Sequence, residues 1–359
     1  MSASLDELLK KMIDVGASDL HLKVGSPPVM RIDGELHPTS LPMLLPNDTE
    51  EYAHSIFTQR AASEFREINE ADFAYGKAEL GRFRVNVYRQ RGSVSLVLRR
   101  VLPSTQNFEE LGLPTVLEKL SQEHRGLLLV TGPTGSGKTT TLASIIDYMN
   151  RTRRVNIITI EDPIEVLHRD KLSIVAQREI GMDTKDFTEA LRRALRQDPD
   201  VILIGEMRDA ETVKAALQAA ETGHLVLSTL HTVDATESVS RIIDFFPPYQ
   251  QQQVRIMLAA TLKGVVSQRL LEKVDGGRVP AVEIMTNNGR VYDRIVDSSQ
   301  TNSLIEVIAE SEFYGMQTFD QSILSLFKAG LISFQTAMSS ASNPHDFRVK
   351  AEQQGLISV

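Results

Sequence analysis

The chain has 359 residues, enough for two or three compact domains with real cores. It has no cysteine, which excludes disulfides and cysteine-ligated zinc, and its net charge of −8 disfavours a nucleic-acid binder, which usually carries a basic footprint. No apolar run approaches the ~20 residues that cross a bilayer, and the N-terminus lacks a secretory pattern. We therefore expect a cytoplasmic protein whose contact with a membrane goes through a partner.

The N-terminal third predicts a small α+β domain over residues 1–101. Apolar residues recur at helical spacing over residues 5–15, and Gly16 follows as a cap. Short stretches of alternating apolar and polar residues come next, at 20–24, 83–87 and 94–99. The pair Asp33-Gly34 predicts a hairpin turn between two strands.

Residues 102–115 carry two prolines with Asn, Gly and Ser, and predict a linker. A second domain is then expected over residues 116–275, because apolar strands alternate with helices, which implies a mostly parallel sheet covered on both faces. The predicted strands are 126–130, 155–160, 201–204 and 225–230, and the predicted helices are 139–149, 187–196 and 210–221. From about residue 250 the pattern is mainly helical, and residues 276–359 are expected to form a helical C-terminal segment. The fold class is thus α/β.

The run from 132 to 139 is a phosphate-binding loop, in the pattern Gly, four residues, Gly, Lys, Ser or Thr. Its backbone N–H groups are expected to surround phosphate oxygens, while Lys138 meets the β- and γ-phosphates and the Thr139 hydroxyl ligates Mg²⁺. An apolar strand precedes the loop and a helix follows it, which disfavours a chance glycine-rich turn. The predicted nucleotide-binding residues are Gly132, Pro133, Thr134, Gly135, Ser136, Gly137, Lys138, Thr139 and Thr140.

Acidic residues follow two other predicted strands. Glu206 comes just after strand 201–204 and is interpreted as a metal-side or water-side carboxylate. Glu161, Asp162 and Glu165 follow strand 155–160, where ligands collect in open α/β sheets. Such clustered acids repel each other unless a cation is present, which Mg²⁺ bound to ATP would supply, and one of them is expected to act as the base on water. Solvated acids in a turn are the alternative.

Two histidines flank the strand 225–230. His231 lies at its carboxyl end, where nucleotides bind, and is expected to hydrogen-bond the γ-phosphate or sense its loss. His224 lies seven positions away, so on a regular strand the two point to opposite faces and do not share a metal. For His224 a structural and a functional role both stay open.

Arginines alternate on the polar face of strand 81–87, at Arg82 and Arg84, and Arg99 lies on the following strand. Phosphoryl-transfer sites gain from arginines that stabilise transition-state charge. A row of solvated arginines is the alternative.

Together these segments resemble the secretion-type ATPases, and most closely the type IV pilus retraction ATPases (the PilT family). The similarity runs from Gly16–Leu22 to Gly315–Phe319. Four nucleotide motifs occur in the family's order: Walker A at Gly132–Thr139, the Asp box at Thr159–Glu165, Walker B at Asp198–Asp209 and the His box at His224–Thr232.

The resemblance implies a homohexameric ring, with an N-terminal PAS-like domain and a RecA-like motor domain in each subunit and with ATP and Mg²⁺ between them. It implies Glu165 as general base, Glu206 as the Mg²⁺-associated Walker B acid and His231 as γ-phosphate sensor. It also implies that Arg84 and Arg99 reach toward the nucleotide phosphates. The implied partners are an inner-membrane pilus platform protein and a paralogous pilus ATPase, with no nucleic acid, so the protein would act at the inner face of the cytoplasmic membrane.

Retraction is favoured over pilus extension or secretion because the extension relatives usually carry an extra N-terminal domain and a four-cysteine zinc site. The chain starts at the PAS-like segment and has no cysteine. The sequence departs from the retraction ATPases in one motif. They often carry Ala-Ile-Arg-Asn-Leu-Ile-Arg-Glu, of which residues 289–297 keep only the arginines, the apolar positions and the final acid.

A nucleic-acid translocase and a nucleotide-gated adaptor without useful turnover are the other function classes. The net charge disfavours the first, and the intact acids disfavour the second.

Overall fold

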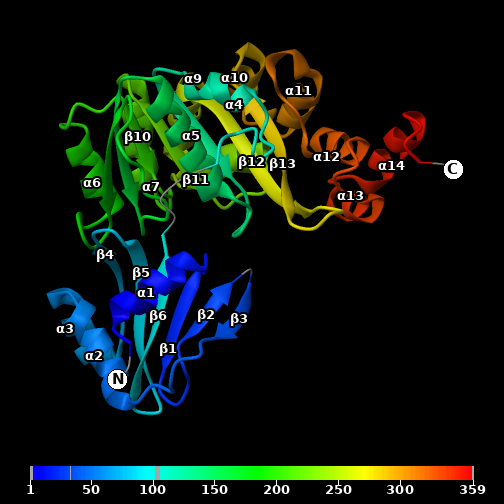
Figure 1. The fold of residues 1–359 in the computed structure, drawn as a ribbon. Helices are drawn as coiled ribbons and strands as arrows, with labels where there is room; N and C mark the ends of the chain where they lie inside the picture. The colour runs from blue at the N-terminus through cyan, green and yellow to red at the C-terminus, as the bar shows by residue number, and fades with distance from the viewer. Residues whose placement is uncertain (1–2, 33, 102–105, 358–359) are drawn as a thin grey trace. The chain divides into compact units, whose positions relative to one another are not determined.

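The computed structural model describes residues 3–32, 34–101 and 106–357. The chain forms two compact units (Figure 1). One comprises Met1–Ser104 together with Glu165–Leu167, and the other comprises Thr105–Ile164 and His168–Val359. Asp33, half of the predicted hairpin turn, and residues 102–105 of the predicted linker lie outside the described residues. The domain boundaries drawn from the sequence stay predictions.

The N-terminal unit packs helices against an antiparallel sheet. Its helices are α1 (Leu5–Asp14), α2 (Pro46–Ile56) and α3 (Gln59–Ile68), and its strands are β1 (Asp19–Lys23), β2 (Val29–Ile32), β3 (Glu35–Pro38), β4 (Glu70–Lys77), β5 (Gly81–Gln90) and β6 (Ser93–Arg100). Within the described residues the strand order is β3-β2-β1-β6-β5-β4. Local signals explain these elements: Ser4 and Glu7 form a capping box at the start of α1, and Phe83, Val85 and Val87 place one face of β5 in the core.

The second unit is built on a mostly parallel sheet. Its strands are β7 (Gly126–Thr131), β8 (Asn156–Glu161), β9 (Ile174–Glu179), β10 (Val201–Ile204), β11 (Leu225–Leu230), β12 (Leu262–Glu272) and β13 (Arg278–Thr286). In the described part of the chain their order is β13-β12-β7-β11-β10-β8-β9, and only the β12–β13 pair is antiparallel. Strands β10 and β11 are buried along their whole length, as expected for strands covered on both faces.

Helices cover both faces of this sheet (Figure 1). One face packs against α4 (Val116–Ser121) and α5 (Lys138–Thr152), and the other against α6 (Phe187–Ala194), α7 (Ala210–Glu221), α8 (Ala235–Asp244) and α9 (Pro248–Thr261). Phe108 and Leu113, inside the predicted linker, are buried in the core that α4 and α5 share.

The C-terminal part continues with α10 (Gly289–Val296), the short 3₁₀ turns Thr301–Ser303 and Glu312–Tyr314, α11 (Leu304–Glu310), α12 (Phe319–Lys328), α13 (Phe334–Ser340) and α14 (Pro344–Gln353). The expectation of a mainly helical pattern from residue 250 was wrong for residues 262–286, because β12 and β13 extend the central sheet there. Leu262 continues the helical spacing of Val254 and Leu258, although α9 ends at Thr261. No helix among the described residues is both long and apolar enough to span a membrane.

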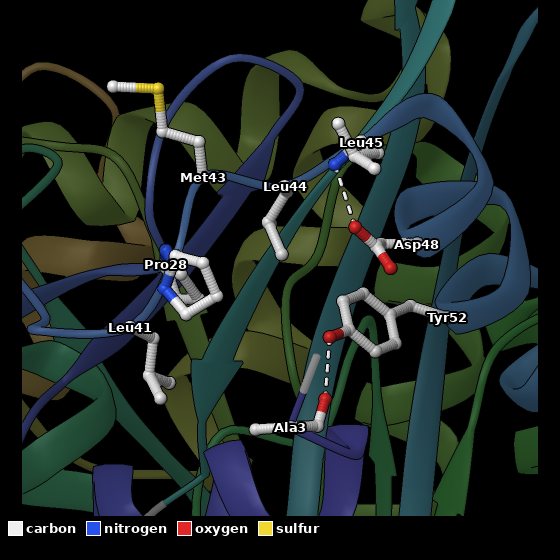
Figure 2. A pocket seen from close by; sticks show the side chains of 9 residues that line it. Ala3, Pro28, Leu41, Met43, Leu44, Leu45, Asp48 and Tyr52 are labelled. Atoms are coloured by element: carbon white, nitrogen blue, oxygen red, sulfur yellow. Dashed lines mark hydrogen bonds between the residues drawn. The ribbon is translucent and has the colours of Figure 1, made fainter. Parts of the chain in front are cut away.

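A cavity of about 260 Å³ lies in the N-terminal unit (Figure 2). Its lining is mostly apolar, with Pro28, Leu41 and Leu44 among the side chains. At its edge the Tyr52 hydroxyl donates to the Ala3 carbonyl oxygen at 2.6 Å, and the Leu45 N–H donates to Asp48 Oδ2 at 2.7 Å. None of its lining residues belongs to the predicted site.

Candidate nucleotide site

The predicted motifs follow neighbouring strands of the central sheet. Strands β7, β11, β10 and β8 are consecutive and parallel, so their carboxyl ends lie along one edge. The phosphate loop follows β7, His231 follows β11, Gly205-Glu206 follows β10 and Asp162 follows β8. Ligands of open α/β sheets bind at this edge. The topology thus brings together motifs that are up to about a hundred residues apart in the sequence.

The phosphate loop has the backbone that its glycines predict. Gly132, Gly135 and Gly137 all have positive φ, at 144°, 79° and 91°. A Cβ on Gly132 would lie 2.5 Å from Ser136 Oγ, and a Cβ on Gly137 would lie 2.7 Å from the side-chain nitrogen of Gln268. Any larger residue at either position would displace the loop from the cradle shape that phosphate binding requires.

Lys138 opens helix α5 and is held inside the loop. Its Nζ donates to the carbonyl oxygens of Gly132 at 2.7 Å and Pro133 at 3.0 Å. Burial lowers the pKa of Lys138, and the charge of Glu206 partly counteracts that shift. Lys138 and Glu206 are therefore close enough to interact electrostatically.

Polar groups of the loop fit a phosphate ligand. The Ser136 hydroxyl is buried and has no hydrogen-bond partner among the described residues. A phosphate oxygen is an acceptor that would satisfy such a donor. Thr134, Gly135, Thr139 and Thr140 are exposed, as residues that meet an incoming ligand must be.

Glu206 lies in a small charged network at the end of β10. Its Oε2 accepts a hydrogen bond from Arg208 Nε at 2.8 Å, and its Oε1 lies 3.4 Å from His231 Nε2. This hydrogen bond and the carboxylate charge raise the pKa of Arg208. The structure thus joins Glu206 to His231, as their places at the sheet edge predict. It adds Arg208, which the sequence analysis passed over although it lies inside Walker B.

A magnesium site at this edge would use few protein ligands. Among residues 3–32, 34–101 and 106–357, no three or more His, Asp or Glu side chains gather as a metal site would require. Mg²⁺ is usually held by one or two protein oxygens together with substrate phosphates and water. The Thr139 hydroxyl and the Glu206 carboxylate are oxygen donors of that kind, so these two residues fit the ion.

The acids of the Asp box have different surroundings. Glu161 Oε1 accepts hydrogen bonds from the Thr159 hydroxyl at 2.6 Å and from Gln177 Nε2 at 3.0 Å. Asp162 is exposed. Gln177 lies on β9, a strand that the sequence analysis did not predict. Glu161 is therefore fixed by its neighbours, whereas Asp162 is open to solvent.

Glu165 groups with the N-terminal unit. There its Oε1 lies 3.1 Å from Arg84 Nη1, in an ion pair in which both side chains are partly exposed. Arg99 in the same unit donates from Nε to the buried Asp19 at 2.7 Å. The catalytic role of Glu165 and the phosphate contacts of both arginines stay predictions.

His224 lies at the amino end of β11, the end opposite His231. Its Nδ1 lies 3.0 Å from the carbonyl oxygen of Ala219 in the last turns of α7. This contact ties the helix to the strand that follows it, which supports the structural alternative for His224.

Comparison with known proteins agrees with this geometry. A family model described as "Type II/IV secretion system protein" matches residues 2–289. The chain belongs to that family. It is 43% identical to the type IV pilus retractation ATPase PilT of Pseudomonas aeruginosa, over 96% of this chain and 99% of the relative. It is 40% identical to the type IV pilus ATPase PilU of the same organism, over 96% of this chain and 90% of that protein.

The fold of this family member also matches a solved structure. A crystal structure of the pilus retraction motor PilT with bound ADP superposes with a TM-score of 0.88 at 46% identity, covering 96% of this chain and 98% of the other. The predicted family and the predicted RecA-like α/β fold are thereby confirmed.

Proposed function

We propose that this chain is the ATP-hydrolysing motor of type IV pilus retraction. The observation that carries the proposal is the meeting of the phosphate loop, Glu206 and His231 at one sheet edge, in a chain similar from end to end to a retraction ATPase. The name of that relative and the ADP of the matching structure support ATP as the substrate.

The phosphate loop is the binding element of the proposed site. Backbone N–H groups of residues 132–139 surround the phosphate oxygens, and the N-terminus of α5 adds its dipole. Lys138 exchanges its carbonyl partners for the β- and γ-phosphates. Thr139 and Glu206 would hold Mg²⁺, which would neutralise charge on the phosphates.

Hydrolysis is assigned to Glu165, to His231 with its neighbour Glu206, and to two arginines. Glu165 acts as the general base that orients water, and His231 senses the γ-phosphate. Glu206 holds the His231 ring in place, since Glu206 Oε1 lies 3.4 Å from His231 Nε2. Arg84 and Arg99 bind phosphate charge. Because Arg84 is paired with Glu165, binding of Arg84 to a phosphate would free that carboxylate to accept a proton.

The motor is proposed to work as a homohexameric ring. A small change at the γ-phosphate becomes a rigid-body movement because packed domains switch between discrete arrangements. We assign its partner as an inner-membrane pilus platform protein, contacted at the inner face of the cytoplasmic membrane. A paralogous pilus ATPase is a second partner, since the chain is similar to both PilT and PilU.

The decisive experiment is deletion in the native host. If the chain drives retraction, the deletion strain should carry excess surface pili and lack twitching motility. Complementation with the wild-type protein should restore motility, and complementation with Lys138→Ala should not. Bald cells would instead show that the chain drives pilus extension, the alternative that the altered segment at residues 289–297 leaves open. Normal piliation and motility would contradict both.

A further inference from the structure

Gln268 lies on β12 beside the phosphate loop, outside the four nucleotide motifs. Strand β12 runs parallel to β7, and Ser267 pairs with Thr131, the last residue before the loop. Gln268 therefore lies level with the start of the loop. Its side chain is almost fully buried, with 3% exposed.

Gln268 lies against the loop at two places and against helix α5 at a third. The Thr141 hydroxyl, in the first turn of α5, donates to Gln268 Oε1 at 2.7 Å. A Cβ on Gly137 would lie 2.7 Å from Gln268 Nε2, and a Cβ on Gly132 would lie 2.4 Å from the Gln268 carbonyl oxygen. One residue thus lies against the first glycine, the glycine before Lys138 and the helix that follows.

The two neighbours of Gln268 anchor the strand. The Thr131 hydroxyl donates to Ser267 Oγ at 2.9 Å. On the other side, Arg269 Nη1 donates to the Ser340 carbonyl oxygen at 3.1 Å, and its guanidinium carbon lies 3.9 Å from the centre of the Phe319 ring. Because both neighbours are fixed, the amide of Gln268 has little freedom to follow a displaced loop.

We propose that Gln268 is a positioning residue for ATP turnover. Its buried amide fixes the spacing between Gly137 and the first turn of α5, its main-chain carbonyl lies against Gly132, and together they present Lys138 and Thr139 in one geometry. Catalysis by positioning is sensitive to such spacing, since a displacement of about 1 Å can cost on the order of a hundredfold in rate. The inference rests on the proposed ATP site and adds a residue that none of its motifs contains.

The test compares steady-state ATP turnover of Gln268→Met, Thr141→Val and the double variant. Each single change removes the Thr141–Gln268 hydrogen bond with little change in volume, so kcat should fall at least tenfold while KM for MgATP changes less than threefold. The double variant should be no more than threefold slower than the slower single variant, because both changes break one contact. Thr141→Ser keeps the hydroxyl and should restore most of kcat.

Thr261→Val is the matched control. Thr261 is also a buried threonine whose hydroxyl donates to a carbonyl, that of Met257 at 2.7 Å, but this bond lies within α9. Its kcat should stay within twofold of wild type. If Gln268→Met fails to fold, the Thr141 series carries the test alone.

The proposal is overturned if Thr141→Val keeps the wild-type kcat, if Thr141→Ser is as slow as Thr141→Val, or if Thr261→Val is equally slow. Lys138→Ala separates this failure from failure of the site. Wild-type turnover in Lys138→Ala rejects the ATP site itself, whereas an inactive Lys138→Ala beside a fully active Thr141→Val rejects only the role of Gln268.

Discussion

Gly137 is required both by its backbone and by its neighbour. Its φ of 91° is unfavourable for a residue with a side chain, and a Cβ would meet Gln268 Nε2 at 2.7 Å. Gly137→Ala should therefore displace the loop and weaken nucleotide binding at least tenfold. Titration with a fluorescent ADP analogue measures this affinity.

Gly276→Ala provides the comparison at the same scale. Gly276 has a similar φ of 85°, but an added Cβ would meet nothing within 4 Å. This variant should bind the analogue like wild type and show only a slightly lower unfolding midpoint. Equal affinities in the two variants would show that the contact with Gln268 does not shape the loop.

The individual site residues differ in how readily the sequence predicts them. The loop from Gly132 to Thr139 was predictable because its glycines, lysine and threonine act within eight neighbouring positions. Gln268 was not, because its partner Thr141 lies 127 positions away and only the pairing of β12 with β7 brings them together. Arg208 lay inside a predicted motif, but its contact with Glu206 depends on side-chain direction after the strand.

Among the elements, β13 joins two helices through one buried side chain. Glu283 Oε1 accepts the N–H of Ala235 at the start of α8 at 2.8 Å, and the carboxylate also accepts the N–H of Phe319 at the start of α12. Burial raises the pKa of Glu283 to about 7; the bonds from these two N–H groups and the charge of Arg269 lower it in part, while Asp234 adds to the rise.

This shifted pKa predicts a pH dependence of stability. Between its unfolded value of 4.5 and about 7, the folded state holds more protons on Glu283 than the unfolded state does. The free energy of unfolding should therefore be highest below that window and fall as pH rises through it, by up to about 1.4 kcal/mol per pH unit.

Thermal unfolding midpoints from pH 5 to pH 8 measure the effect. Glu283→Gln cannot titrate there, so its midpoint should fall less than that of wild type across the window. Glu272→Gln, at an exposed position at the end of β12, should keep the wild-type slope. Parallel curves for wild type and Glu283→Gln would contradict the shifted pKa.

Elements with a strong local period were predictable, and those fixed by pairing were not. The strand 225–230 is mostly apolar and forms β11 at those bounds. Strands β12 and β13 were missed because the helical spacing before them continues into Leu262, although Asp275-Gly276 between the two strands is a local hairpin signal. Strand β9 was missed because it mixes exposed and half-buried residues at the edge of the sheet.

For the whole molecule, alternation of strands and helices was enough to predict a parallel sheet, and a parallel sheet places its ligands at the carboxyl edge. The grouping of Glu165 with the N-terminal unit was beyond such reasoning, because its ion pair with Arg84 joins positions 81 residues apart. The central claim is that this sheet edge in the second unit hydrolyses ATP.

The most direct test of that claim is phosphate release by the purified full-length protein with MgATP. Wild type should turn over ATP, and Lys138→Ala should lose at least 95% of that rate because the cradle loses its charge to the phosphates. Lys214→Ala, which removes an exposed lysine on α7, should keep the wild-type rate. Equal rates in Lys138→Ala and Lys214→Ala would contradict the account.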